Sequence, residues 1–210
     1  MRILYKINLA PRKIRYYFYL LWNRFIFYIN NIPYGKNLRI YNQFYLAKHP
    51  SAHIEIGNNF TFISGEAFNP LCRNIRGSIF ADENAFLKIG NNTGISSACI
   101  WVKESIIIGN NVKIGGDCIL MDTDAHNLNY QIRNGSILDE KGRLLDRKTA
   151  KSKPIIIEDD VLVGTRCIIL KGVTIGARSI IGSGSVVTKS IPPDVIAAGN
   201  PCKVIKSLKL

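Results

Sequence analysis

Residues 154–191, PIIIEDDVLVGTRCIILKGVTIGARSIIGSGSVVTKSI, repeat one pattern every six residues. Each sixth position holds a branched aliphatic residue, and a small or β-branched residue stands two positions before it. The aliphatic positions are Ile157, Val163, Ile169, Ile175, Ile181 and Val187. The earlier positions are Ile155, Val161, Cys167, Val173, Ser179 and Ser185. Because strand residues two apart point to the same side, we expect both series to face an interior.

A period of six residues is a sequence signature of parallel β-helices. Glycine follows the aliphatic residue at Gly164, Gly176 and Gly182, where it lets the backbone turn. Short strands joined by such turns stack as coils roughly 4.8 Å apart. With three hexads in each coil, the stacked pairs are Ile157 with Ile175, Val163 with Ile181, and Ile169 with Val187. The segment therefore predicts an all-β fold, a parallel β-helix of hexapeptide repeats.

The repeat extends upstream with interruptions. The expected inward residues there are Ile89, Ile95 and Trp101, followed after one inserted residue by Ile108, Ile114 and Leu120. Ile56 and Gly57 resemble an isolated earlier hexad, and the pattern is lost between Gly65 and Ala85, where we expect an irregular coil. The expected organisation is an N-terminal segment at 1–50, the β-helix at 51–206 and a short tail at 207–210.

A polar, turn-rich stretch interrupts the repeat at residues 122–153. The register resumes cleanly at Ile155, so we expect this stretch to be a loop extruded sideways from the β-helix. Long irregular loops within regular domains are often functional.

The outward positions of the repeat are also mostly apolar. They are Ile156, Leu162, Ile168, Thr174, Ile180 and Val186. Apolar surface of this extent usually marks an interface. We therefore expect a homo-oligomer closed as a ring, and a homotrimer fits that geometry.

The chain has 210 residues and a formal net charge of +13, which favours a polyanionic partner such as nucleic acid, an anionic membrane or a phosphate-rich cofactor. Its 28 Lys and Arg residues do not form one block, and no nucleic-acid-binding motif accompanies them, so we expect no nucleic-acid partner. The five cysteines lack a CxxC pair, which indicates reduced thiols in a cytoplasmic protein. Cys118 and Cys167 occupy small-residue positions of the repeat and are expected in the core.

The N-terminal segment is basic and aromatic and is expected to be helical in part. It lacks the small-residue cleavage site of a signal peptide, and its apolar run from Tyr16 to Ile29 is interrupted by Asn23 and Arg24. Two interpretations remain open: a helix docked on its own β-helix or on a neighbouring subunit, and a helix lying on the inner face of an anionic membrane.

His126 stands at the start of the interrupting loop, in the sequence MDTDAHN. Histidine can remove a proton from a hydroxyl near neutral pH, and a nearby carboxylate can hold its ring in the required tautomer. Asp122 and Asp124 are the candidates for that carboxylate. The alternative interpretation is a solvated loop histidine among turn-forming residues.

Residues 108–206 resemble the hexapeptide-repeat acetyltransferases with a left-handed parallel β-helix, the galactoside and maltose O-acetyltransferase group. The resemblance is carried by IIIGNNVKIGGDCIL, by DTDAHNL and by the run from Ile155 to Lys206. The upstream FNPLCRNIRGSI and IGNNTGISS are more similar to the branch that acetylates capsule, O-antigen or exopolysaccharide sugars. The left hand of the helix is implied only by this resemblance.

The resemblance implies roles for individual residues. It implies that His126 is the catalytic base and that acetyl-CoA is the co-substrate, with no metal. The positions implied for the cofactor are Gly164, Thr165, Ser183, Thr188, Lys189, Lys203 and Lys206, of which the last two face the CoA phosphates. The expected substrate-binding residues are Ser96, which lies near an acceptor-binding position of the family, and Asn127, which follows the histidine where the family has proline. The expected reaction is O-acetylation of a sugar hydroxyl during synthesis of a bacterial surface polysaccharide.

Several alternatives remain. The acceptor could be another small hydroxyl or amino compound, such as a free sugar, serine or a xenobiotic. A zinc hydratase on the same fold needs three converging histidines, but His49 and His53 precede the regular repeats. A non-catalytic β-solenoid that serves as a scaffold is the third alternative.

Overall fold

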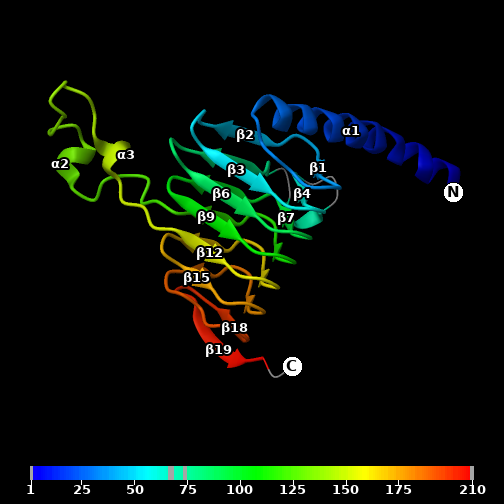
Figure 1. Cartoon of the computed structure of the whole chain (residues 1–210). Helices are drawn as coiled ribbons and strands as arrows, with labels where there is room; N and C mark the ends of the chain where they lie inside the picture. Colours follow the sequence, from blue (N-terminus) through cyan, green and yellow to red (C-terminus); the bar gives the residue numbers. More distant parts are fainter. Residues whose placement is uncertain (1, 66–68, 73–74, 209–210) are drawn as a thin grey trace.

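The protein is a left-handed parallel β-helix with a long helix at one end and a loop that projects from its side (Figure 1). The computed structural model describes residues 2–65, 69–72 and 75–208, and the side chains of residues 2–10, 12 and 13 lie outside the description. Three sheets form the walls of the solenoid, with eight, six and five strands.

The eight-stranded sheet has the order β1-β4-β7-β10-β13-β16-β18-β19. Its strands are β1 (Arg39–Tyr41), β4 (Thr61–Ile63), β7 (Gly94–Ser96), β10 (Lys113–Ile114), β13 (Leu162–Val163), β16 (Ile180–Ile181), β18 (Val195–Ala198) and β19 (Lys203–Ser207). Neighbouring strands pair in parallel except β18 and β19, which form an antiparallel pair at the C-terminal end.

The strands of the other two sheets pair in parallel. The six-stranded sheet contains β2 (Tyr45–Lys48), β5 (Ser78–Ala81), β8 (Cys99–Val102), β11 (Ile119–Met121), β14 (Ile168–Leu170) and β17 (Val186–Val187). The five-stranded sheet contains β3 (His53–Ile56), β6 (Phe86–Ile89), β9 (Ser105–Ile108), β12 (Ile155–Ile157) and β15 (Thr174–Ile175).

The core follows the six-residue repeat from Ile155 to Val187. All six predicted aliphatic residues and all six predicted small residues in this stretch are buried. The register pairs Ile157 with Ile175, Val163 with Ile181 and Ile169 with Val187, which confirms the predicted stacking. Cys118 and Cys167 are buried in this column, as expected for core residues.

The predicted register is wrong at Trp101. Ile100 is buried and pairs with Leu120, whereas Trp101 lies outside the core and pairs with Met121. The inward positions Ile95 and Ile100 are five residues apart because this coil is one residue short, and Ser97 takes a positive φ of 42° at the corner.

The β-helix also begins before the expected boundary at residue 51. Strands β1 and β2 already pair with β4 and β5, and Leu38, Ile40, Phe60 and Phe62 are buried in the first coils. Ile56 therefore belongs to a continuous stack rather than to an isolated hexad. The stretch from 65 to 77 includes a short 3₁₀ helix, Pro70–Cys72, and is irregular where it is described, whereas regular strands resume at β5.

Asparagine and aspartate residues form a column at one corner of the solenoid. Asn59, Asn92, Asn111 and Asp160 have φ between 56° and 61°, a region that Asn and Asp tolerate better than most residues. Their side chains bond to one another along the column, with distances of 2.9, 3.1 and 2.9 Å. This ladder satisfies the polar groups of successive turns and fixes the spacing of the coils.

The loop at 122–153 projects sideways from the solenoid and contains two short helices, α2 (Tyr130–Arg133) and α3 (Asp146–Thr149) (Figure 1). Thr123 and Ser152 form an antiparallel bridge at its base, so the two limbs leave and return together. The regular coil continues on both sides of this base, with β11 before it and β12 after it.

A 28-residue helix, α1 (Arg2–Ile29), lies across the N-terminal end of the β-helix. It ends against β1 and the first coil, and the rest of the N-terminal segment contains β1 and β2. In the described part of the chain, no helix has the length and hydrophobicity needed to cross a membrane.

Candidate active site

His126 is paired with a carboxylate from the far side of the loop. Its Nδ1 lies 2.6 Å from Oδ2 of Asp146, the first residue of α3. The other oxygen of Asp146 accepts a 2.7 Å hydrogen bond from the backbone N–H of Asn127. The imidazole is largely exposed to solvent, so its second nitrogen, Nε2, is accessible.

The hydrogen bond to His126 and the N–H of Asn127 hold the pKa of Asp146 below its usual range. An ionised carboxylate can only accept, so Nδ1 of His126 carries the proton and Nε2 of the neutral ring is left as a base. This is the tautomer that proton removal from a hydroxyl requires.

Neither of the carboxylates expected from the sequence contacts the histidine ring. Asp122 is buried, and its side chain accepts hydrogen bonds of 2.7–2.8 Å from the backbone N–H groups of Lys103, Glu104 and Ser105. Burial raises the pKa of Asp122, and these three donors oppose the rise. Asp124 forms a 2.6 Å ion pair with Lys171. The predicted role of Asp122 and Asp124 in orienting the His126 ring is therefore wrong. These two residues anchor the base of the loop, and Asp146 orients the ring.

Several contacts hold the two limbs of the loop around this pair. The Asn127 side chain donates to Thr149 Oγ1 at 2.8 Å, and Lys103 Nζ donates to the carbonyls of Arg147 and Ala150 at 2.6 and 2.7 Å. Ala125 has a φ of 62°, a local turn that places His126 against α3. Asn127 thus fixes the loop through its side chain and its backbone.

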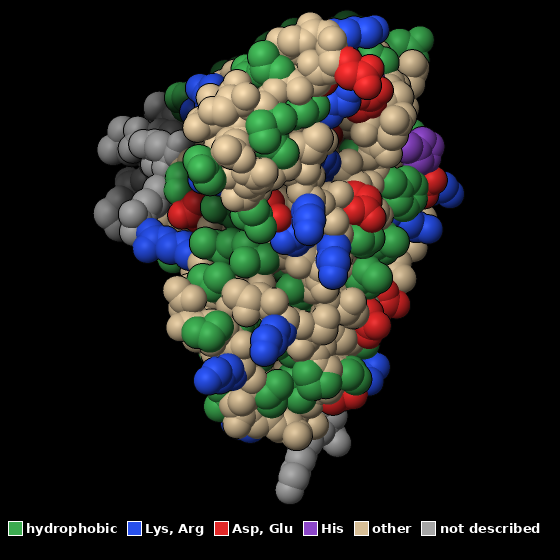
Figure 2. Space-filling view, turned by 90° about the vertical axis from the view of Figure 1, so that its left-hand side faces the viewer, with side chains coloured by type: hydrophobic (Ala, Val, Ile, Leu, Met, Phe, Trp, Pro, Cys, Tyr) green, Lys and Arg blue, Asp and Glu red, His purple; other side chains and the backbone are tan. Residues whose placement is uncertain are grey.

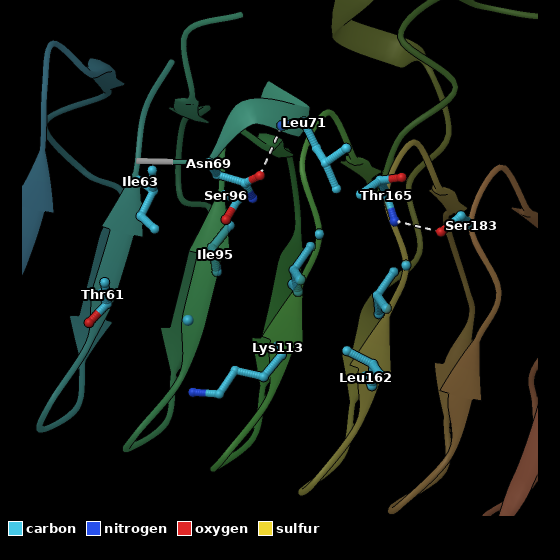
Figure 3. A pocket seen from close by; sticks show the side chains of 15 residues that line it. Thr61, Ile63, Asn69, Leu71, Ile95, Ser96, Lys113, Leu162, Thr165 and Ser183 are labelled. Carbon is cyan, nitrogen blue, oxygen red and sulfur yellow. Dashed lines mark hydrogen bonds between the residues drawn. The ribbon is translucent and has the colours of Figure 1, made fainter. Parts of the chain in front are cut away.

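A groove of about 420 Å³ runs along the outside of the eight-stranded sheet (Figure 3). It contains four residues predicted from the sequence: Ser96, Gly164, Thr165 and Ser183. Thr61, Lys113 and Leu162 also line it, as does Leu71, whose backbone N–H donates to Asn69. The walls are mostly apolar, with hydroxyls and backbone groups at the corner of the coils.

The corner at Gly164 allows close approach of two coils. A Cβ on Gly164 would lie 2.5 Å from the backbone nitrogen of Ser183, so only glycine fits there. The backbone N–H of Thr165 donates to Ser183 Oγ at 3.2 Å. Glycine thus lets the two coils approach closely at the edge of the groove.

The remaining residues predicted to bind the cofactor lie toward the C-terminal end of the solenoid. Thr188 and Lys189 are exposed in the turn after β17, and Lys203 and Lys206 are exposed on β19. None of the three lysines takes part in an ion pair among the described residues. Their charges are therefore available to an anionic group.

The groove and His126 lie on different parts of one chain. The groove follows the eight-stranded sheet, whereas the loop leaves the six-stranded sheet after β11, and no loop residue is among the groove's described lining residues. A single chain therefore does not bring His126 together with Thr165 and Ser183.

A second hollow, of about 660 Å³, lies between the solenoid and the returning limb of the loop. Trp101 and Phe80 contribute aromatic rings, and Trp101 Nε1 donates to Asp82 at 3.0 Å. The Arg147 guanidinium lies 5.2 Å from the centre of the Trp101 ring. Ala125 and Arg147 line this hollow, and each is adjacent in sequence to one member of the His126–Asp146 pair.

Sequence reasoning missed Asp146, Arg147 and Trp101 as parts of this region. Asp146 lies 20 residues from His126 in a non-repeating loop, and no periodic signal marked it. The sequence DRKT at 146–149, an acid followed by two bases after a polar run, is the signal for a short helix that could have drawn attention to it.

Of the other two histidines, His49 also lines the second hollow, and neither bonds to Asp146. His53 pairs with Glu55 at 2.9 Å, and His49 bonds to Ser51 at 2.8 Å. Among the described residues, no group of three His, Cys, Asp or Glu side chains is arranged to hold a metal ion.

The face that carries the loop mixes charges of both signs with apolar side chains (Figure 2). Lysine and arginine are scattered over it rather than gathered into one basic patch, in keeping with their dispersal along the sequence.

Residues 154–189 match the family model described as the hexapeptide repeat of succinyl-transferase. The match covers the most regular coils and agrees with their stacked six-residue register. The chain resembles hexapeptide-repeat acetyltransferases. The galactoside O-acetyltransferase of Escherichia coli K12 is 40% identical over 105 residues, which cover 50% of this chain and 45% of that protein.

Two solved structures extend the comparison. A galactoside acetyltransferase in complex with coenzyme A has a TM-score of 0.51 and 27% identity, covering 84% of this chain and 65% of that one. A mutant of AntD, an N-acyltransferase from Bacillus cereus, in complex with dTDP-4-amino-4,6-dideoxyglucose and coenzyme A, has a TM-score of 0.64 and 19% identity and covers 85% of this chain and 84% of that one, a likeness of fold. The matched stretch spans about half the length of the curated relatives.

Proposed function

We propose that the protein is an acetyl-CoA-dependent O-acetyltransferase whose base is His126. The observation that carries the proposal is the His126–Asp146 pair, an accessible imidazole in the tautomer suited to proton removal, on a loop of a hexapeptide solenoid. The similarity of the solenoid to galactoside O-acetyltransferase supports acyl transfer as the reaction class.

In the proposed reaction, Nε2 of His126 takes the proton of an acceptor hydroxyl as its oxygen attacks the thioester carbonyl of acetyl-CoA. Asp146 stabilises the imidazolium that forms. The tetrahedral intermediate then collapses, the carbon–sulfur bond breaks, and the CoA sulfur receives the proton from His126. The products are an acetyl ester and free CoA, and the histidine returns to its starting tautomer.

Acetyl-CoA is proposed to lie along the groove. The hydroxyls of Thr165 and Ser183 are available to the amide-containing arm of the cofactor, and the apolar side chains of Ile63, Leu71 and Leu162 suit its methylene groups. The exposed ammonium groups of Lys189, Lys203 and Lys206 are suited to its phosphates as point charges. Thr188 lies beside Lys189 in the same turn.

We infer that the complete active site forms between subunits of a homotrimer. Within one chain, His126 and the groove lie on different sheets, so a neighbouring protomer has to supply one of them. The outward positions of the repeat lie on all three sheets, and the outer face of the eight-stranded sheet carries Leu162, which is 45% exposed, next to Ile180. Burying this face between protomers removes it from water and brings the loop of one chain toward the groove of the next.

The proposed acceptor is a sugar of a bacterial surface polysaccharide or of its precursor, acetylated in the cytoplasm. The hollow beside His126 supports a sugar because Trp101 and Phe80 provide apolar rings, and Asp82 and Arg147 provide groups that bond to hydroxyls. Ser96 in the groove is the further acceptor position that the family resemblance implies.

The test is release of CoA thiol from acetyl-CoA with sugars, amino sugars, serine and small alcohols as acceptors. The wild-type protein is expected to release CoA fastest with a sugar hydroxyl, and His126→Ala is expected to lower that rate by about 10²- to 10⁴-fold. His53→Ala is the matched control, since His53 is also exposed and paired with a carboxylate. It is expected to keep the wild-type rate.

Other outcomes distinguish the alternatives. A preference for amino acceptors, with a stable amide as product, would assign N-acetylation instead. Equal release by wild type and His126→Ala with every acceptor would exclude the proposed mechanism and favour a binding or scaffold role.

A further inference from the structure

Helix α1 presents a continuous apolar and aromatic face to solvent. We call the following residues the aromatic face: Ile14, Tyr17, Phe18, Leu21, Trp22, Phe25, Tyr28 and Ile29. Their side chains are 46–77% exposed, and their three- and four-residue spacing places them on one side of the helix. Exposed apolar groups of this extent mark an interaction surface.

The opposite face of α1 is fixed to the β-helix. Phe27 is fully buried, and Tyr16 stacks on Tyr41 with ring centres 4.8 Å apart. The buried Asn23 side chain donates to the carbonyls of Ile40 and Asn42, both at 3.0 Å. These contacts fix the rotation of the helix about its axis, so the aromatic face cannot turn toward the core.

The charges of α1 are all of one sign. The helix contains six basic residues and no Asp or Glu. The basic residues are Arg2, Lys6, Arg12, Lys13, Arg15 and Arg24. Basic residues beside Trp, Tyr and Phe are the composition of helices that lie in the interface of an anionic bilayer. Neither α1 nor any other helix in the described part of the chain is long and apolar enough to cross a bilayer.

The position of α1 suits contact with a flat surface. Figure 1 shows the helix across the end of the solenoid opposite the C-terminus, with its N-terminal half extending beyond the coils.

A second copy of the helix is the competing occupant of this face. Ile14, Phe18, Leu21, Phe25 and Tyr28 are spaced four and three residues apart, as in a coiled-coil seam. Pairing two such helices brings two sets of basic residues together with no acidic partner on either helix. The charge pattern therefore favours an anionic lipid surface over self-association.

We propose that α1 docks the protein on an anionic lipid bilayer, with the aromatic face in the headgroup region and the β-helix extending away from the membrane. This inference is independent of the proposed reaction, since α1 contributes no residue to the candidate active site.

The test is co-sedimentation of the full-length protein with vesicles. Vesicles of phosphatidylcholine with phosphatidylglycerol are compared with vesicles of phosphatidylcholine alone, at low salt and at about 1 M salt, where the Debye length is about 3 Å. We expect the protein to bind the anionic vesicles at low salt. The bound fraction is expected to be lower at high salt, and lower with the neutral vesicles than with the anionic ones.

The variant Phe18→Ser/Leu21→Ser/Phe25→Ser is expected to lower the affinity for anionic vesicles by at least about tenfold. The control Val204→Ser/Ile205→Ser removes exposed apolar side chains from β19 and is expected to bind as wild type does. Thermal denaturation checks that both variants fold. The triple variant is also expected to keep CoA release with a soluble acceptor.

Two results would overturn the proposal. One is absence of binding to anionic vesicles by the folded wild-type protein. The other is a loss of oligomeric mass in the triple variant with vesicle binding unchanged, which would assign the aromatic face to a contact between copies.

Discussion

At the scale of single residues, the pairing of His126 with Asp146 has the most direct chemical consequence. A short hydrogen bond to an ionised carboxylate sets the tautomer of the ring and stabilises the imidazolium during proton transfer. The same carboxylate also binds the N–H of Asn127, so it orients the backbone that carries the ring.

We predict that Asp146→Asn lowers kcat by at least about tenfold, with little change in the KM for acetyl-CoA. An amide can offer its N–H to Nδ1 and thereby favour the wrong tautomer, but it does not touch the groove. Steady-state kinetics measure the two parameters. The control is Asp139→Asn, since Asp139 is a loop carboxylate that bonds to Arg143 and not to the histidine. Equal effects of the two substitutions would contradict a positioning role for Asp146.

Asp122 is expected to act on stability rather than on chemistry. Asp122→Ala leaves three backbone N–H donors without their acceptor. We expect the free energy of unfolding to fall by about 3 kcal/mol and Tm to fall by roughly 6–12 °C. Thermal denaturation followed by circular dichroism measures the change. Glu55→Ala, which breaks only an exposed pair with His53, is expected to shift Tm by far less. An unchanged Tm in Asp122→Ala would show that the buried carboxylate is not an anchor.

The residues that could be predicted from the sequence are those whose positions recur. Gly164, Thr165 and Ser183 stand within the repeat, where the family resemblance implied cofactor contacts, and all three line the groove. Asp146 could not be predicted, because its contact with His126 depends on how a loop without periodicity folds back. Asp122 and Asp124 are nearer to His126 in the sequence. However, backbone N–H groups at 103–105 bind Asp122, and Lys171 binds Asp124.

At the scale of elements, the β-helix and the loop are separable parts. The bridge between Thr123 and Ser152 closes the loop at its base, and the coils on either side remain in register. The regular coils were predictable because one slip would expose the buried aliphatic residues. The short coil at Ser97 and the early coils built on Phe60 and Phe62 depart from the six-residue pattern, so the sequence misplaced Trp101 and the start of the solenoid.

We predict that replacing residues 125–150 with a short Gly-Ser turn abolishes acetyl transfer but leaves a folded β-helix. The bulk of the buried core lies outside the loop. We therefore expect Tm to change by only a few degrees, which corresponds to about 1–2 kcal/mol in the free energy of unfolding. Circular dichroism and CoA release are measured on the same sample, with full-length His126→Ala as the control that keeps the loop. Global unfolding of the shortened protein would show that the loop stabilises the solenoid.

At the scale of the whole molecule, the apolar outer face of the repeat and the separation of His126 from the groove both point to assembly. We predict that sedimentation equilibrium gives three times the mass of one chain. Leu162→Glu/Ile180→Glu places two charges on adjacent positions of one outer face and is expected to shift the protein to monomers. Ile205→Glu on β19 is the control for an exposed site. A wild-type monomer would contradict the proposed assembly.

The most direct test of the central claim is a crystal structure of the oligomer with CoA bound. We predict that CoA occupies the groove at Thr165 and Ser183 of one protomer. Its sulfur is then expected within about 4 Å of Nε2 of His126 in the neighbouring protomer, close to the separation of reacting groups in a productive complex. CoA bound away from the groove, or with its sulfur remote from every His126, would contradict the account.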